Sequence, residues 1–466
     1  MKRFGTRDGS SSSLPYAASI LVVAALGHIL VLRTWWFHDD WVFLADAAGL
    51  ADRSSSAVRF VSYDVYWRLL YPLFGLTGWA YGLTRLAIHA TTAWLVGRLA
   101  RQARATRAQA VIASLLYAAA PSAFESLYWG TGIVELLGVV FTAAAVERWF
   151  SGHRFGRIWG LAFAALALGS KEVGLFLPLL FGWDLARRRE GGTATWFGVI
   201  LLSAFAAWMA TLLAVDAGDA GGYSVDAGRI PRNLCVYGFW LAAPAPWQFV
   251  ATLGSRWALA AGGLVWSAWL VSAFLGWRRN DRRLMFLLVT AVVVLAPVLA
   301  VGDHALPRYV LGACIPGALA LAMVAVPARL GLKPWGTITL GCLLVAVTAW
   351  GVHHRLERRW PAGRPVHRLV VKEEISRKVR DGLVQLRGEL GAGDRLVFLI
   401  DPDTTDDDLH YLRDAVAGSL GPRLMLGDDI AVDWRKALGE AEIGSYVILV
   451  KGVGLEALGH YRPRPR

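Results

Sequence analysis

Charged residues and cysteines are both scarce in this sequence. Asp, Glu, Lys and Arg make up 18% of the 466 residues, whereas a soluble domain carries roughly 25%. The three cysteines, Cys235, Cys314 and Cys342, lie far apart among apolar residues. Their odd number and wide spacing exclude a disulfide framework and match no metal-ligand pattern. The sequence also lacks internal repeats and a glycine-rich phosphate loop between a strand and a helix, and its composition excludes a single soluble domain.

Long apolar blocks take the place of charge. Hydrophobic residues make up 56% of the chain, and the mean hydropathy is +0.44. The blocks are about 17–22 residues long, enough for a helix to cross a bilayer core of roughly 30 Å. We therefore predict an all-α polytopic membrane protein with about eleven transmembrane helices. The predicted spans are 14–33, 73–97, 108–122, 131–148, 157–169, 173–186, 194–215, 257–277, 284–301, 309–327 and 335–352.

Basic residues exceed acidic ones, and the formal net charge is +13. In a soluble protein this excess would suggest a nucleic-acid partner. Here the basic runs, such as Arg187 to Arg189, follow the ends of apolar blocks, so we interpret them as orientation signals and expect no nucleic acid. With the N-terminus in the cytoplasm, every short basic run falls on the cytoplasmic side. The first apolar block is too long for a cleaved signal peptide, which favours a retained span.

The composition changes near residue 356 to that of a soluble domain. Apolar residues recur at helical spacing from Val371 to Leu390, and the stretches 395–400 and 446–451 have the pattern of buried strands. We expect this small α/β domain to lie outside the cytoplasm. A separate interfacial helix is expected near 232–242, between the seventh and eighth spans. The predicted organisation is a membrane domain over 1–355, with large outer loops at about 34–72 and 216–256, and a C-terminal domain over 356–466.

Several charged residues fall on the predicted outer side or within spans, where charge is costly and points to function. Asp39 and Asp40 follow the first span. Repulsion between adjacent carboxylates raises the pKa of one of them, and a carboxylate that titrates near neutral pH can act as a general base. The alternative is a solvated helix N-cap. Glu125 lies between the third and fourth spans and either faces water or points into a site. Arg85 and His89 lie one turn apart on the second span, where they face an outer cavity or pair and pack inside the bundle.

Two further candidate pairs carry positive charge. Lys171 and Glu172 separate two short spans, an arrangement that could leave a wet cavity in which Lys171 binds a phosphate; the alternative is a simple ion pair. Arg308 and Tyr309 begin the tenth span. An arginine at a helix N-terminus can hold a phosphate together with the free backbone N–H groups, or it can serve as an interfacial anchor.

The evidence for a metal site is weaker. Asp303 and His304 supply only two candidate ligands. The acidic run 401–408 lacks the glycine and the final glutamate of a calcium loop, and we interpret it as a solvated turn. No metal is required for the chemistry considered below, although Asp39 and Asp40 could hold a divalent ion.

Taken in order, these segments resemble the GT-C superfamily of membrane glycosyltransferases. The motif HDDW, from His38 to Trp41, is similar to the acidic motif in the first outer loop of that superfamily. The branch that it resembles is that of the protein O-mannosyltransferases and related bacterial and TMTC-type enzymes. Relatives often carry an arginine after the tryptophan that precedes the fourth span, where this chain has Gly130 to Ile133. The resemblance continues through 69–101, 110–138, 167–181 and 306–317.

The resemblance implies a GT-C-like bundle and an inverting glycosyltransferase. The donor would be a polyprenyl-phosphate-linked sugar, and the acceptor a hydroxyl of a protein, a lipid or a glycan on the outer face of the cytoplasmic membrane. Asp39 takes the place of the catalytic acid, with Asp40 beside it. Substrate binding is expected from the remaining candidates, which are Glu125, Lys171, Glu172, Arg308, Tyr309, Arg85 and His89.

The expected chemistry needs one base and a cation for the leaving phosphate. Asp39 would deprotonate the acceptor, and Arg308 and Lys171 would stabilise the phosphate. The alternatives are a transporter, a lipid-linked-sugar flippase, a polysaccharide polymerase or ligase, and a membrane anchor for the C-terminal domain. A transporter predicts ionisable residues spread across the membrane depth, whereas these acids gather at one face.

Overall fold

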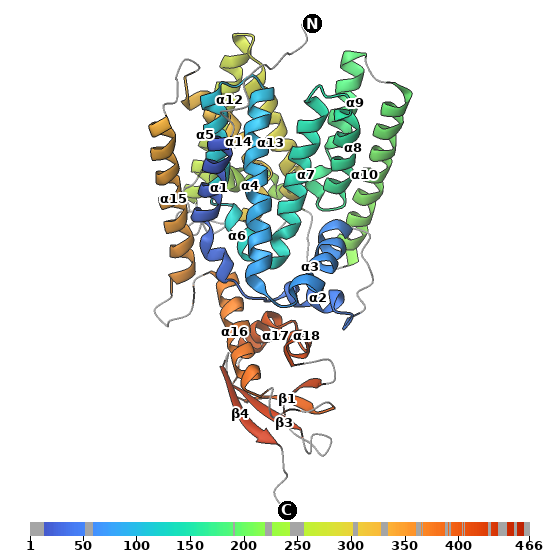
Figure 1. Cartoon of the computed structure of the whole chain (residues 1–466), viewed down its shortest axis with the longest axis vertical. Helices are drawn as coiled ribbons and strands as arrows, with labels where there is room; N and C mark the ends of the chain where they lie inside the picture. The colour runs from blue at the N-terminus through green and yellow to red at the C-terminus, as the bar shows by residue number, and fades with distance from the viewer. Residues whose placement is uncertain are drawn as a thin grey trace, which may run out of the picture.

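The computed structural model shows a helical bundle with a small α/β unit at one end (Figure 1). Candidate residues Asp303 and His304, the N-terminal residues and the C-terminal tail lie outside the described part. The residues that the structure describes are 14–51, 59–189, 192–219, 226–242, 256–301, 306–327, 334–359, 365, 367–386, 390, 393–402, 404, 406–426, 430–436, 445–451 and 454–460.

Helices form where the sequence places its apolar blocks. The first block forms α1 (Leu14–Gly27) and then a 3-10 turn, η2 (Ile29–Arg33). The later blocks and the helix expected near 232–242 are confirmed as helices with shifted ends. These are α4 (Gly78–Gln102), α5 (Arg107–Ala118), α7 (Ile133–Phe150), α8 (Gly156–Leu168), α9 (Leu177–Arg188), α10 (Thr193–Asp219), α11 (Ile230–Ala242), α12 (Arg256–Arg278), α13 (Arg283–Leu299), α14 (Cys314–Ala325) and α15 (Pro334–Glu357). A short helix that was not predicted, α6 (Ala123–Tyr128), lies in the connection between the third and fourth spans.

The apolar helices differ in how deeply they are buried. Within the described ranges, four helical stretches are long and apolar enough to cross a membrane: Gly130–Phe150, Thr193–Leu212, Arg256–Arg278 and Gly336–Glu357. The first is 89% buried and forms the centre of the bundle, whereas each of the others is 22% buried. Their exposed apolar faces suit contact with lipid chains. Eleven spans and the orientation of the termini stay predictions.

The predicted first outer loop folds into short helices across the end of the bundle. These are α2 (Asp39–Ala47), a π-helical turn η3 (Val61–Val65) and α3 (Tyr66–Phe74). Aromatic rings fill the space beneath them: Trp36 meets Tyr81 edge-on with centroids 4.7 Å apart, and Phe43 stacks on Trp67 at 5.7 Å. Such pairs add to the gain from burial, so this layer gives α2 a fixed base.

The C-terminal unit is a small α/β fold. Its sheet has the order β2-β1-β3-β4; β1 pairs in parallel with β2 and β3, and β4 runs antiparallel to β3. The two strands and the helix predicted in this region are confirmed. The elements are α16 (Arg368–Leu386), β1 (Arg395–Ile400), α17 (Asp406–Ala415), α18 (Leu420–Leu426), β2 (Ala431–Arg435), β3 (Tyr446–Lys451) and β4 (Gly454–His460).

The α/β unit packs directly on the first outer loop and α6. Trp41 of α2 donates from Nε1 to the Ser376 hydroxyl at 3.2 Å, and Tyr128 of α6 donates to Glu373 at 3.2 Å. A Cβ at Gly421 would lie 3.1 Å from the Trp41 ring, so α18 also approaches α2 closely. These contacts join α16 and α18 to the same end of the bundle where Asp39 and Asp40 lie (Figure 1).

A glycine contact between α11 and α12 provides a test of the packing. A Cβ at Gly262 would lie 1.7 Å from the Cys235 carbonyl oxygen, whereas a Cβ at the adjacent Gly263 would meet only the Cys235 sulfur at 3.9 Å. We expect Gly262→Ala to lower the free energy of unfolding by about 1–3 kcal/mol through overpacking. Thermal unfolding of the detergent-purified protein measures this. Gly263→Ala is the matched control, and equal melting temperatures for the two variants would contradict the packing described.

Candidate functional site

The buried carboxylate of Asp40 holds the start of α2 against the turn before α7. Its Oδ1 accepts hydrogen bonds from the backbone N–H and the hydroxyl of Thr131, both at 2.7 Å, and its Oδ2 lies 3.4 Å from the Phe37 nitrogen. Thr131 belongs to the 3-10 turn η4 (Gly130–Gly132). A Cβ at Gly130 would lie 2.8 Å from Asp40 Oδ1, so the absence of a side chain there admits the carboxylate.

Burial changes the acidity of Asp40. Loss of solvation raises its pKa from 3.8 to about 6, against the opposing hydrogen bond from Thr131 and the charge of Arg85. A carboxyl group with a pKa in this range can exchange protons near neutral pH. The side chain is wholly buried, however, so in this conformation a substrate does not reach it directly.

Asp39 is the accessible member of the pair. Its side chain is 45% exposed, and its Oδ1 lies 3.4 Å from Nε2 of His38. The other ring nitrogen of His38 lies 2.5 Å from the carboxylate of Asp414, at the end of α17. His38 has a φ of 57°, which is uncommon for a residue with a side chain. Its backbone N–H donates to the Ala415 carbonyl at 2.9 Å, so the C-terminal unit holds His38 by backbone and side chain.

Asp414 stays ionised over the working pH range. Partial burial raises its pKa, but hydrogen bonds from His38 and from Lys372 outweigh burial and lower the pKa to about 2. Lys372, on α16, also forms an ion pair with Asp414. The Asp414 carboxylate can therefore accept a hydrogen bond from His38 Nδ1 and orient the ring toward Asp39.

A buried aromatic residue connects the acids to Arg308. The His38 ring stacks on Trp129 with centroids 5.7 Å apart, and the Arg308 guanidinium lies 4.6 Å from the centroid of Trp129. Arg308 also lies 5.3 Å from the ring of Tyr309. Its Nη1 is buried without a hydrogen-bond partner in the described part of the chain. A buried, unsatisfied guanidinium nitrogen is costly in a folded chain, and it is a donor available to an anionic ligand.

Lys171 continues this chain of contacts. Its ammonium lies 5.2 Å from the centroid of the Tyr309 ring and forms ion pairs with Glu135 at 3.1 Å and Glu172 at 3.2 Å. Arg59 donates from Nε to Glu172 at 2.8 Å. The cluster borders a hollow of about 20 Å³, room for about one water molecule. The contacts of Lys171 therefore go beyond the simple ion pair with its sequence neighbour Glu172, because Glu135 of α7 also binds it.

Glu125 lies on α6, close to the C-terminal unit. Its Oε1 is 3.7 Å from His367 Nε2, and its Oε2 is buried without a hydrogen bond among the described residues. Arg308 lies within electrostatic reach of both Glu125 and Glu135. Glu125 therefore borders the same region as Arg308. A second cation, Arg355 of α15, also lies within electrostatic reach of Glu125.

Arg85 and His89 make contacts inside the bundle. Arg85 donates from Nε to the Leu127 carbonyl at 2.8 Å and from Nη2 to the Thr34 hydroxyl at 3.2 Å, and it is 1% exposed. His89 Nε2 lies 3.0 Å from the Ala118 carbonyl oxygen. Arg85 reaches Asp40 electrostatically, whereas no contact joins His89 to Asp39, Lys171 or Arg308 within the described ranges. The substrate-binding roles expected for both stay predictions.

The residues do not form a metal site as they stand. No group of three His, Cys, Asp or Glu side chains in the described ranges could hold a metal ion. Oδ1 of Asp40 already accepts two hydrogen bonds, and Asp39 is turned toward His38. A zinc site takes three or four ligands from the protein, which this donor set does not supply, whereas Mg²⁺ can be held by one or two carboxylates together with a substrate phosphate. The divalent ion considered for Asp39 and Asp40 therefore stays a prediction, and we derive no step through it.

Sequence reasoning missed the residues that connect the candidates. His38 lies within the HDDW motif, but its partner Asp414 is in the last part of the chain, and no local pattern links the two. Trp129 is mentioned above only as the tryptophan that precedes the fourth span, and Arg59 belongs to no motif. Charge complementarity with Glu172 was the one signal that could have selected Arg59.

Comparison with known proteins yields distant structural likeness only. No protein-family model and no curated protein matches the sequence. An archaeal oligosaccharyltransferase, AglB from Archaeoglobus fulgidus, solved with an inhibitory peptide and a dolichol-phosphate, matches with a TM-score of 0.45 and 13% identity over 90% of this chain and 65% of that one. The A. fulgidus oligosaccharyltransferase in complex with Zn and sulfate matches with a TM-score of 0.47 and 10% identity, over 90% of this chain and 62% of that one. The same enzyme tethered to an acceptor peptide with an NVT sequon matches with a TM-score of 0.43 and 13% identity, over 90% of this chain and 63% of that one. This chain thus spans less than two thirds of each of those chains.

The shifted pKa of Asp40 predicts a pH-dependent stability difference. The pKa is about 6 in the folded chain against 3.8 when unfolded, so the folded state binds the proton more tightly and stability falls as the pH rises through this interval. Asp40→Asn removes this loss. Relative to wild type it should gain about 3 kcal/mol between about pH 4 and pH 7, measured by thermal unfolding at each pH. A difference that does not change with pH would contradict the raised pKa.

Proposed function

We propose that this protein transfers a sugar from a polyprenyl-phosphate carrier to an acceptor hydroxyl. The observation that supports this most is the continuous set of contacts from Asp39 through His38 and Trp129 to Arg308. It connects an accessible carboxylate to a half-buried cation through one aromatic ring. The exposed apolar helices supply the bilayer contact that a lipid-bound donor requires.

Asp39 is the proposed base because it is the exposed acid of the pair. Its carboxylate takes the proton of the acceptor hydroxyl, the hydroxyl oxygen bonds to the anomeric carbon, and the bond from that carbon to the phosphate oxygen breaks. The electron pair leaves on the polyprenyl phosphate. A single displacement of this kind inverts the anomeric carbon and needs one base. Asp40 acts as a positioning residue, because its hydrogen bonds with Thr131 fix the start of α2.

Arg308 is the proposed partner of the leaving phosphate. Its Nη1 has no hydrogen bond among the described residues, whereas the charge of Lys171 is already balanced by Glu135 and Glu172. A cation fixed before the reaction stabilises charge that develops in the transition state. Lys171 and Tyr309 then serve mainly to hold Arg308 in place, since Tyr309 contacts both cations.

The C-terminal unit completes the site in this proposal. Asp414 orients His38, and His38 contacts both Asp39 and Trp129. An acceptor that reaches Asp39 therefore approaches at the junction between α2 and α17. We place this junction on the outer side of the cytoplasmic membrane, with the N-terminus in the cytoplasm, on the basis of the basic runs described above. The acceptor can be a protein, a lipid or a glycan.

Substitution of the acid pair tests the proposal. Asp39→Asn removes the base and should lower the transfer rate by about 10²–10⁴-fold. Membranes supplied with a labelled polyprenyl-phosphate sugar provide the assay. Asp381→Asn, at an exposed position of α16, is the control and should transfer at the wild-type rate. Wild-type transfer by both Asp39→Asn and Asp40→Asn would contradict the assignment of this pair.

Substitution of Arg308 tests the phosphate contact. Arg308→Gln removes the charge and should lower kcat by about 10²–10³-fold with a smaller change in KM, as expected for a group that acts on developing charge. Arg308→Lys should recover part of the rate, because it restores the charge without the planar donor pair. Arg256→Gln, exposed at the start of α12, serves as the control. A loss confined to KM would show that Arg308 binds the ground state only.

A further inference from the structure

Helix α3 and the residue before it carry an exposed apolar stripe. Val65, Leu69 and Leu73 recur at a spacing of four residues and are 42%, 63% and 71% exposed. This spacing places side chains on one face of a helix. The other side of α3 is buried against the bundle through Tyr66 and Trp67. None of these residues has a part in the sugar transfer proposed above.

The exposed face of α3 is poorly suited to water. A helix face that meets water normally carries charged side chains, and a large exposed apolar patch points to a partner. The exposed residues of α3 are Arg68, Leu69, Pro72 and Leu73. Arg68 is the one charged residue among these four, and its Nη2 lies 3.2 Å from the Asp46 carboxylate of α2. The stripe itself therefore offers apolar surface alone.

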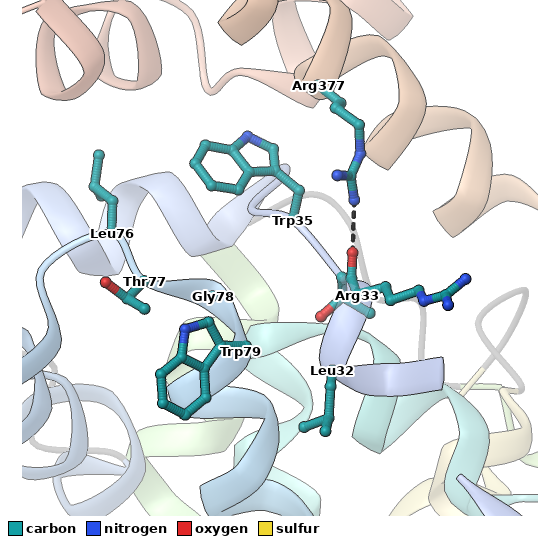
Figure 2. Close-up of a pocket in the computed structure, with 9 residues that line it drawn as sticks. Leu32, Arg33, Trp35, Leu76, Thr77, Gly78, Trp79 and Arg377 are labelled. Atoms are coloured by element: carbon teal, nitrogen blue, oxygen red, sulfur yellow. Dashed lines mark hydrogen bonds between the residues drawn. The ribbon is translucent and has the colours of Figure 1, made fainter. Parts of the chain in front are cut away.

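The stripe continues into the outward side of α4. A turn of three residues, 75–77, separates the two helices, and Figure 2 shows this turn leading to Trp79. Tyr81 of α4 donates from its hydroxyl to the Gly75 carbonyl at 3.1 Å, which fixes the end of α3 to α4. Trp79 and Leu83, one turn apart on α4, are 57% and 53% exposed. The apolar surface of α3 is thus an extension of the apolar surface of α4.

The position of α3 puts the stripe at the edge of the predicted membrane. α4 contains most of the second predicted span, 73–97. Tryptophans near the ends of spans mark the level of the lipid head groups, and Trp79 marks this level on α4. In Figure 1, α3 lies above α2, beside the lower ends of the bundle helices. A surface that continues from a span at this level meets lipid.

We propose that the apolar face of α3 inserts into the lipid leaflet at this end of the bundle. Acyl chains surround Val65, Leu69 and Leu73, and Arg68 lies at the level of the head groups. An amphipathic helix binds a membrane surface in this way, with its apolar face about 5–10 Å into the boundary between head groups and acyl chains. A long basic side chain keeps its charge in the polar layer while its stem lies on apolar surface.

The inserted helix would hold the first outer loop at the membrane surface. α2 packs on α3 through the stack of Phe43 on Trp67 and through the ion pair of Asp46 with Arg68. The depth of α3 in the leaflet therefore sets the distance of α2 from the bilayer. This inference concerns the position of the loop and does not rest on the proposed function.

Spin labels on the full-length protein in phosphatidylcholine nanodiscs test the proposal. Leu69→Cys and Leu73→Cys are labelled one at a time, in a chain that also carries Cys235→Ala, Cys314→Ala and Cys342→Ala. Collisions of the label with oxygen, which concentrates in hydrocarbon, are compared with collisions with a water-soluble nickel chelate. We expect frequent oxygen collisions and a loss of nickel collisions, which correspond to a depth of about 5–10 Å.

Two further positions provide matched controls. Asp381→Cys, exposed on α16, should collide with nickel as a label in water does, and Leu83→Cys, exposed on α4, should collide mainly with oxygen. Nickel collisions at Leu69 and Leu73 equal to those at Asp381 would overturn the proposal, because the stripe would then face water. Loss of collisions with both reagents would also overturn it, because protein, such as a second copy of this chain, would then cover the stripe.

Discussion

The contact between Asp40 and Thr131 determines the arrangement of the rest of the candidate site. It joins the first outer loop to the turn before α7, two parts of the chain that are distant in sequence. Because η4 follows Trp129 directly, the same contact fixes Trp129, which touches both His38 and Arg308. Burial of a carboxylate is costly, and here two short hydrogen bonds and the charge of Arg85 offset part of that cost.

The α/β unit contributes contacts to the candidate site and is not only an appendage of the bundle. Ala415 and Asp414 hold His38, and Ser376 binds Trp41 in the first turns of α2. The bundle residues in these contacts, His38 and Trp41, flank Asp39 and Asp40 in the sequence. The proposed chemistry therefore depends on this junction, at which Asp39 is the exposed acid.

The sequence was sufficient for the long apolar helices and for β1 and β3, but not for β2, β4, the short helices α2, α3 and α6, or the connections. Apolar blocks predicted α7, α10 and α12 because burial in lipid or protein requires long runs of one residue type. The strand at 395–400 was predicted for the same reason. The contact of His38 with Asp414 was not, because long-range pairing leaves no periodic pattern. Equally, adjacency of Asp39 and Asp40 did not indicate that one would be buried and the other exposed.

The most direct test of the central claim is a structure of the protein with a polyprenyl phosphate bound in a lipid nanodisc. The account predicts that the phosphate accepts a hydrogen bond from Nη1 of Arg308 and lies on the far side of Trp129 from His38. A phosphate bound away from Arg308, with Asp39 and Arg308 facing separate spaces, would contradict it.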